Sequence, residues 1–368
     1  MTSHLVRSGR TVVLGDSPVA RGLRAVLDAG GAAGDGTGAA SGGDLLGAAA
    51  VVVVGQTGDF AAVPTRRVAE QRAVAAEQVR SAVAAAARAG VEHVVGISSA
   101  MVEGAAPDRQ PIDDADESRD DAHDVQEVDG AGGSTSGAGS TESLDPGSTD
   151  TGAAGDLLAF EAAILAAAAD EGVERVTVLR PAVLVGPDVD TLLTRHFEAP
   201  RILTVRGVRR DWQLVHLDDL ASAVAVAVER RLTGALTVGA VRDGRPDVLS
   251  PEEVVEVSGL RAVDLPAAVA FATAERLHRL GVLPSPASDL ACTVYPWTVT
   301  SRRLAAAGWS PTWSSRACLE LLVEQTGGRT GVGGRRVARR DAAALGAAGA
   351  AVALLGTAAV WRQARGRR

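Results

Sequence analysis

The feature that most constrains this fold is a series of short apolar runs separated by helix-length segments. Residues 11–15 (Thr-Val-Val-Leu-Gly) and 48–55 (three alanines, four valines and a glycine) are almost free of polar side chains. A strand of a parallel sheet is buried on both faces and shows such an unbroken run, whereas a half-exposed strand alternates. Further runs of this kind occur at 91–99, 175–186 and 234–239.

Helical patterns lie between the apolar runs. Residues 65–90 are rich in alanine and stop at Ala-Gly, and residues 156–172 form a second long apolar segment. Residues 250–325 are also mostly helical in pattern. Alternating buried strands and helices predict a Rossmann-like, doubly wound α/β fold with a mostly parallel sheet and a smaller C-terminal lobe.

The composition removes several kinds of chemistry. The chain contains 37 Lys plus Arg residues, and the printed sequence shows that all of them are arginine. A lysine Schiff base, lysine general base or lysine phosphate clamp is therefore excluded. Cys292 and Cys318 do not have metal-ligand spacing and are expected to be a reduced pair, so no metal site is predicted. The N-terminal residues have no signal-peptide pattern, which predicts a cytoplasmic protein.

An acidic segment interrupts the alternation. Residues 104–155 are rich in Asp, Gly, Ser and Thr and hold most of about fourteen acidic side chains counted over 104–156. Such a segment buries too little apolar surface to offset its ordering entropy, so we expect a disordered insertion. The predicted organisation is a Rossmann-like domain at 1–103 and 156–248, the acidic insertion at 104–155, a smaller lobe at 249–327, a basic linker at 328–341 and an apolar helix at 342–361.

The apolar segment at 342–361 has about the ~20 residues that cross a bilayer. One interpretation is a membrane anchor flanked by arginines, and the other is a soluble Ala-rich helix, since Ala and Gly insert weakly. No pattern of interleaved basic and aromatic residues predicts a nucleic-acid interface. The oligomeric state is left open.

The turn after the first run is the first candidate site. Gly15, Asp16 and Ser17 stand where a dinucleotide site needs glycines for close approach of pyrophosphate to a helix N-terminus. Pro18 and Arg21 occupy the positions of the next two glycines, and Asp16 brings negative charge. Weak dinucleotide binding and a helix cap without a nucleotide both fit this pattern. Residues 29–44 show no clear second strand, so the adenosine half of such a site is eroded.

Three motifs in the middle of the chain resemble a known family. The Ser-Ser-Ala ending at Ala100, the Leu-Arg-Pro-Ala at 179–182 and the Val-His-Leu-Asp-Asp at 215–219 are similar to motifs of the extended and atypical short-chain dehydrogenases/reductases. This superfamily includes the NAD-dependent epimerases and dehydratases. The resemblance covers residues 11 to about 240 without the insertion, and it implies a small-molecule ligand and NAD or NADP as cofactor.

The resemblance also implies roles for individual residues. Ser99 matches the catalytic hydroxyl that hydrogen-bonds the substrate, although Ser98 and Ser99 also fit a plain strand-end turn. The cofactor-binding residues implied are Gly15, Asp16, Ser17, Gly55, Ser98, Pro181 and Ala182. Asp218 and Asp219 are better explained as caps of a helix that begins at Leu220.

The chain departs from this family at its Tyr-x-x-x-Lys pair. In the family the Tyr transfers the proton, and the Lys lowers the pKa of that Tyr and holds the nicotinamide ribose. The equivalent positions here are Gly155 or Asp156 for the Tyr, and Ala159 or Phe160 for the Lys. The single Tyr of the chain, Tyr295, lies far downstream. The usual chemistry is therefore impossible in this chain.

Other residues offer weaker candidates. His196 and His216 are possible acid/base groups beside several arginines, but a single histidine is more often a packed residue. Trp212 fits either a ligand stack or the core. The aromatic residues of the lobe fit a substrate pocket or a protein interface equally. Two functions stay open: an NAD(P)-binding epimerase/dehydratase-like protein with altered or lost catalysis, and a non-enzymatic ligand-sensing or scaffold protein.

Overall fold

The computed structural model describes most of the chain between Arg10 and Ala338. The described residues are 10–29, 45–59, 68–115, 152–199, 201–280, 283, 285–326, 329–332 and 335–338, the last two ranges as backbone only. The segments 116–151 and 342–361, on which predictions of an insertion and an apolar helix fall, lie outside them.

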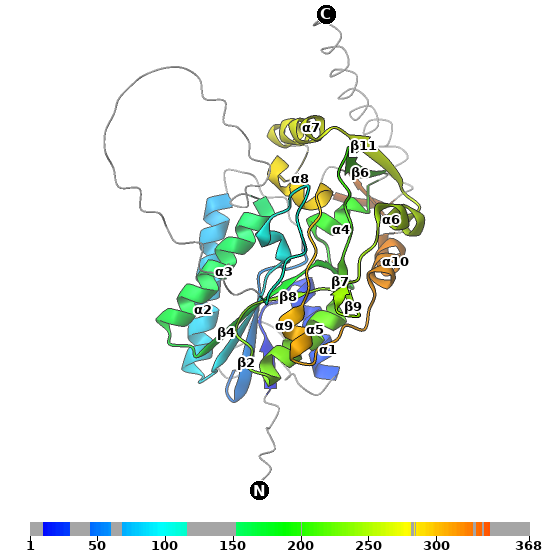
Figure 1. Ribbon diagram of the computed structural model, residues 1–368. Helices are drawn as coiled ribbons and strands as arrows, with labels where there is room; N and C mark the ends of the chain where they lie inside the picture. The colour runs from blue at the N-terminus through cyan, green and yellow to red at the C-terminus, as the bar shows by residue number, and fades with distance from the viewer. Residues whose placement is uncertain are drawn as a thin grey trace, which may run out of the picture.

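The centre of the molecule is a five-stranded parallel sheet (Figure 1). Each strand comes from an apolar run of the sequence, as predicted. The order is β1-β2-β3-β4-β8, with β1 at Arg10–Val13, β2 at Ala48–Val54, β3 at His93–Ile97, β4 at Arg175–Pro181 and β8 at Gly234–Val238.

Helices cover both faces of this sheet, which confirms the predicted Rossmann-like α/β fold (Figure 1). Val52 and Val54 of β2 face one layer, and Val51 and Val53 face the other, so the four consecutive valines of this strand contribute to two cores. One layer is α1 (Pro18–Ala29) with α5 (Leu217–Glu229), and the other is α2 (Val68–Arg88) with α3 (Gly152–Asp170).

The elements outside the five-stranded sheet and its two helix layers are short. Parallel pairs form between β5 (Val183–Val185) and β7 (Leu214–His216), and between β6 (Arg201–Val205) and β11 (Arg261–Leu265). The hairpin of β9 (Val241–Arg242) and β10 (Arg245–Pro246) is antiparallel. The helices are α4 (Leu192–His196), α6 (Pro251–Ser258), α7 (Ala267–Arg279), α8 (Ala287–Val294), α9 (Arg302–Ala306) and α10 (Ser315–Thr326).

Three stretches differ from the prediction. Residues 175–186, expected as one strand, divide into β4 and β5, because the chain changes partner: the N–H of Ala182 still donates to Val238 of β8 (2.8 Å), whereas Val183–Val185 pair with β7. The pair β12 (Arg329–Val332) and β13 (Arg335–Ala338) stands where a linker was expected. β11 lies within a region whose pattern predicted mainly helices.

The disordered segment was predicted to begin at residue 104, which is too early in the sequence. After the 3₁₀ helix η2 (Ala100–Glu103), residues 104–115 form an ordered strap across the molecule. Ile112 is buried and pairs with Val299. Asp114 accepts hydrogen bonds from the N–H groups of Thr237 (3.1 Å) and Arg302 (2.9 Å). Backbone pairing and the Asp114 carboxylate therefore order a segment whose composition alone predicts disorder.

Among the described residues, one helix, α3, is long and apolar enough to cross a membrane by length and composition. This helix packs against α2 and the sheet, and seven of its apolar residues are buried in the two cores. Its apolar character is explained by the core.

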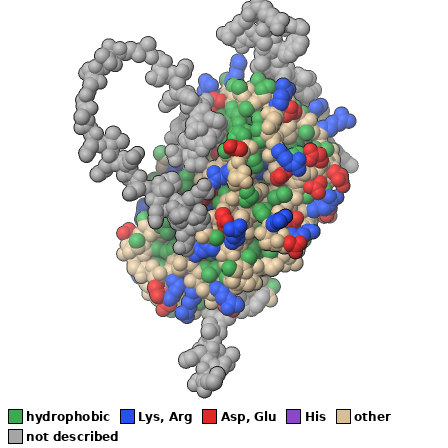
Figure 2. Space-filling model, viewed as in Figure 1, with side chains coloured by type: hydrophobic (Ala, Val, Ile, Leu, Met, Phe, Trp, Pro, Cys, Tyr) green, Lys and Arg blue, Asp and Glu red, His purple; other side chains and the backbone are tan. Residues whose placement is uncertain are grey.

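Acidic and basic side chains are interspersed over the face shown in Figure 2.

Candidate functional site

The residues implied by the family resemblance meet at one edge of the sheet. Gly15 follows β1, Gly55 follows β2, Ser98 and Ser99 follow β3, and Pro181 ends β4. Parallel strands place their carboxyl ends together, and ligands of open α/β sheets bind at this edge. The geometry of each position decides what it can do.

Helix α1 has no unused backbone donor in its first turn. Pro18 has no N–H group, and the N–H of Val19 donates to the carbonyl of Thr57 (3.1 Å). The N–H of Ala20 donates to Oγ of Ser17 (3.2 Å), which makes Ser17 the N-cap. The helix end at which a phosphate binds in dinucleotide sites is thus satisfied by the protein itself.

Two arginine side chains fold back over the same turn. Nη1 of Arg24 donates to the carbonyls of Gly15 (2.5 Å) and Val13 (3.2 Å), and its Nη2 lies 3.3 Å from Oδ1 of Asp16. Nη1 of Arg21 donates to the carbonyl of Asp16 (2.5 Å). Gly15 has a φ of 86°, so the turn does require glycine at this position.

Gly55 faces the core between the sheet and α3. A Cβ on Gly55 would lie 2.5 Å from the ring of Phe160, and its N–H donates to the carbonyl of Ile97 (2.8 Å). Phe160 is one of the two positions aligned with the family's lysine, and its buried ring packs over Gly55 and Gly96. Glycine is needed at 55 because the aromatic ring lies against the backbone.

The two serines are fully buried, with no measurable exposed surface. Oγ of Ser99 donates to the carbonyl of Pro181 (3.3 Å) and accepts from the N–H of Met101 (3.4 Å), so Ser99 caps η2. Oγ of Ser98 has no hydrogen-bond partner among the described residues. The geometry favours the strand-end turn over an exposed catalytic hydroxyl at Ser99.

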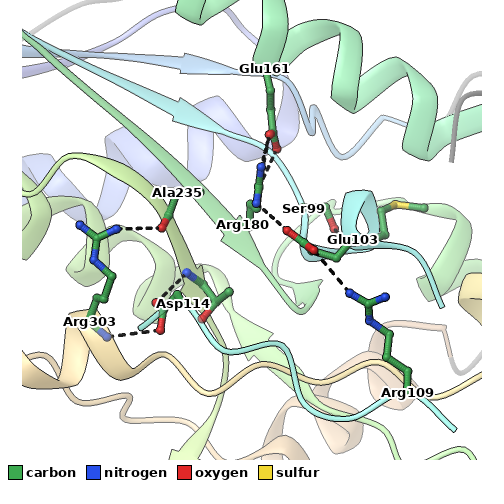
Figure 3. A network of polar contacts seen from close by, with 10 residues as sticks. Ser99, Glu103, Arg109, Asp114, Glu161, Arg180, Ala235 and Arg303 are labelled. Carbon is green, nitrogen blue, oxygen red and sulfur yellow. Dashed lines mark hydrogen bonds and ion pairs between the residues drawn. The ribbon is translucent and has the colours of Figure 1, made fainter. Parts of the chain in front are cut away.

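A network of ionised side chains lies beside Ser99 (Figure 3). Nη2 of Arg180 is 2.6 Å from Oε2 of the buried Glu161, and its Nη1 is 2.6 Å from Oε1 of Glu103. Nη2 of Arg109 lies 3.4 Å from Oε2 of Glu103. Glu161 is on α3, Arg180 on β4 and Glu103 on η2, so the network joins three elements at the sheet edge.

None of the positions aligned with the family's Tyr carries a proton donor toward Ser99. Gly155 is buried and has no side chain. Asp156 is exposed, and its Oδ1 is 2.6 Å from Nε of Arg72 on α2.

Sequence reasoning missed the Glu161–Arg180 pair, although an acid inside an apolar helix was a signal for a buried partner.

The candidate histidines are structural. His196 is stacked on Trp212, with ring centroids 5.5 Å apart, and burial followed by the nearby Arg210 lowers its pKa to about 4. Nδ1 of His216 accepts from the N–H of Asp218 (3.2 Å) and caps α5, and burial lowers its pKa. Both rings are neutral at physiological pH and lie in the core, which favours the packed interpretation.

The structure corrects the predicted start of helix α5 and decides between the two interpretations of Trp212. Helix α5 begins at Leu217 and not at Leu220, and its N-cap is His216 instead of an aspartate. Asp219 instead accepts from the N–H groups of Thr312 (2.7 Å) and Trp313 (3.0 Å). Trp212 is 2% exposed, so it belongs to the core. Within the described residues, no group of three or more His, Cys, Asp or Glu side chains forms a metal site.

Comparison with solved structures identifies the fold. Similar structures include gox2253 (TM-score 0.57, 18% identity, 86% of this chain and 97% of that chain covered). Others are the human epimerase family protein SDR39U1 with NADPH (TM-score 0.52, 17% identity, 86% of this chain and 99% of that chain covered) and MoeE5 with UDP-glucuronic acid and NAD (TM-score 0.52, 20% identity, 86% and 99%). The fold is that of the epimerase/dehydratase-like proteins. No protein-family model and no curated protein sequence matches the chain.

The epimerase/dehydratase-like fold implies a nicotinamide dinucleotide, and the turn after β1 tests whether one fits. A pyrophosphate there needs free N–H groups at the start of α1, and each first-turn position is a proline, a donor to Thr57 or a donor to Ser17. β1 is also an outer strand of the described sheet, whereas the first strand is central in the six-stranded dinucleotide-binding order. The residues present do not fit the dinucleotide in this position.

Proposed function

We propose that this protein keeps the epimerase/dehydratase-like fold but has lost the Tyr/Lys hydride chemistry of that fold. Support comes first from the sequence, which has no lysine and one tyrosine. Tyr295 is buried in the lobe with its ring 5.6 Å from that of Phe271, and burial raises its pKa. Packing against Phe271 fixes the position of this ring.

The observation that carries the proposal is the Glu161–Arg180–Glu103 network. Acid/base catalysis beside Ser99 needs a group that releases and recovers a proton near neutral pH. Arg180 donates to both oxygens of Glu161 (3.1 and 2.6 Å). Both oxygens of this carboxylate are engaged in charge-assisted hydrogen bonds to Arg180, so the network has a structural role and Glu161 does not replace the missing Tyr.

The test is a hydride-transfer assay on the full chain. The protein is incubated with NAD⁺ or NADP⁺ and a panel of UDP-sugars, and the nicotinamide absorbance is followed. We expect no turnover above a protein-free control, and the same result for Ser99→Ala. Turnover by the wild-type chain that Ser99→Ala abolishes would overturn the proposal and restore Ser99 as a catalytic residue.

The second candidate, a ligand-sensing or scaffold protein, is favoured by one observation. The backbone donors that open α1 are bonded within the chain, so the edge that binds cofactor in related folds is used for internal contacts. A small-molecule ligand and membrane attachment through 342–361 remain proposals for this candidate. Fractionation of cells that express the chain with and without 342–361 tests the attachment.

A further inference from the structure

A second region, which we call the crossing, lies over the carboxyl ends of β1 and β2. Its residues and contacts are separate from those around Ser99. It is formed by the start of α1, the loop that follows β2 and the loop that follows β5. In dinucleotide-binding sheets the pyrophosphate passes over this crossing, at the N-terminus of the first helix.

Backbone hydrogen bonds join all three segments. The N–H of Val19 donates to the carbonyl of Thr57 (3.1 Å), which ties α1 to the loop after β2. The N–H of Asp190 donates to the carbonyl of Gly58 (2.7 Å), which ties that loop to the one after β5. The positive end of the α1 dipole therefore meets a peptide carbonyl of the same chain.

Apolar packing fills the space between these bonds. Val19 is fully buried and Val189 is 4% exposed. A Cβ on Gly58 would lie 2.8 Å from Cγ2 of Val19 and 3.5 Å from Cγ1 of Val189, so Gly58 lies close to both valines. Gly58 also has a φ of 70°, which favours glycine at this close approach.

An ion pair between Arg195 and Asp190 stabilises the loop after β5, next to this packing. Nε and Nη2 of Arg195 donate to Oδ1 (2.8 Å) and Oδ2 (2.7 Å) of Asp190, a bidentate geometry that fixes the loop after β5. The Asp190 side chain is 11% exposed and that of Arg195 is 19% exposed. A partly buried bidentate pair holds its geometry better than an exposed one.

We propose that Val19, Thr57, Gly58 and Val189 form a seam that seals this crossing, so that the chain itself occupies the position of the pyrophosphate and excludes nicotinamide dinucleotides. The seam does not rest on the proposed function, because it involves neither Ser99 nor the Glu161–Arg180 network. A sealed crossing also ties three loops together without a bound ligand.

Thermal unfolding and calorimetric titration of the full chain test the seam. A dinucleotide bound with a Kd of about 1 μM would, at about 1 mM, raise the Tm by several degrees. We expect no change in Tm and no saturable heat with NAD⁺, NADH, NADP⁺ or NADPH. We also expect Val19→Ala to lower the Tm more than Val26→Ala, a matched substitution in the same helix at a partly buried site.

Ser17→Asp locates any binding that is seen. Aspartate keeps the N-cap of α1 but adds a carboxylate that repels a pyrophosphate at the turn. Saturable binding by the wild type that Ser17→Asp weakens tenfold or more overturns the seam. If Ser17→Asp leaves the affinity unchanged, the dinucleotide binds at another place, and this result supports the seam. Binding without hydride transfer overturns only the seam, whereas hydride transfer overturns the proposed function.

Discussion

Two buried ionisable side chains, Arg210 and Asp289, are stabilised by helix ends. Arg210 is 4% exposed and donates to the carbonyls of Cys292 (3.2 Å) and Thr293 (3.4 Å) at the end of α8, between the rings of Trp212 and Trp297. Burial lowers its pKa to about 9. A cation complements the negative end of a helix, so the arginine and tryptophans of the lobe form a core and not a ligand stack.

Asp289 has the opposite role at the start of α3. It is 3% exposed, and its Oδ1 accepts from the N–H of Ala153 (3.0 Å). The pKa of Asp289 is raised to about 7, mainly by burial and also by the nearby Asp156, against the opposing effects of the N–H of Ala153, Ser285 and Arg72. The folded chain therefore binds a proton that the unfolded chain releases between about pH 4 and pH 7.

This difference predicts how stability depends on pH. Because the pKa of Asp289 is higher in the folded state, its contribution is fully present below pH 4 and is lost as the pH rises through 7. Asp289→Asn keeps an acceptor for Ala153 and removes the titration. We expect the variant to lose less stability than the wild type between about pH 5 and pH 8, by on the order of 2 kcal/mol. Parallel pH profiles of urea unfolding for the two proteins would contradict this assignment.

At the scale of elements, the Glu161–Arg180 pair joins α3 to β4. Removing one partner of a buried pair leaves an uncompensated charge, which costs about 3–5 kcal/mol. We expect Arg180→Met to lower the free energy of unfolding by about this amount. Arg316→Met is the control, because Arg316 pairs with Glu256 on the exposed surface.

The double variant Arg180→Met/Glu161→Leu tests the cause of that loss. Both charges are then replaced by apolar groups, so much of the stability should return, although Glu103 loses its contact with Arg180 and keeps the one with Arg109. Urea unfolding measures all three variants. Two outcomes would argue against a buried pair. One is an equal loss of stability for Arg180→Met and Arg316→Met, and the other is a double variant less stable than Arg180→Met.

Much of the sheet was predictable because its signal is local. Each strand of the five-stranded sheet is a short apolar run, and burial on both faces leaves the same pattern in every run. β11 has no such signal: Arg261, Ala262 and Asp264 are exposed, and the strand is defined by its pairing with β6. The strap was missed for the same reason, since Ile112 and Asp114 are ordered by distant partners.

The candidate site was less predictable than the sheet. The sequence showed that lysine is absent, which is a matter of composition, and that Gly15 begins an unusual turn, which follows from residues adjacent in the chain. The Glu161–Arg180 pair and the hydrogen bond between Val19 and Thr57 join residues far apart in sequence. Local patterns do not specify such contacts, because either partner alone fits several environments.

At the scale of the whole molecule, the chain on both sides of residues 116–151 is fastened to the lobe. On the N-terminal side, Oδ2 of Asp113 is 2.6 Å from Nη1 of Arg302, and Asp114 accepts from the backbone of Arg302 and Arg303. On the C-terminal side, Asp289 accepts from Ala153. The described fold therefore holds both ends by contacts that do not involve the segment between them.

These anchors predict that the acidic segment is dispensable for folding. We expect replacement of residues 117–150 by a flexible Gly/Ser linker of about fifteen residues to leave the Tm within about 2 °C of the wild type. Differential scanning calorimetry measures the shift. Asp289→Ala in the same background is the control, because it removes an anchor and should lower the Tm of either form. A large loss of stability on replacement alone would mean that 117–150 contribute to the core.

The seam at α1 also bears on how the amount of folded protein responds to metabolism. A fold stabilised by a bound nucleotide gains stability with the concentration of that nucleotide, so its abundance follows the nutritional and redox state of the cell. The carbonyl of Thr57 belongs to the same chain as Val19, and its local concentration is constant. A protein closed in this way would persist at the same level in starved and well-fed cells.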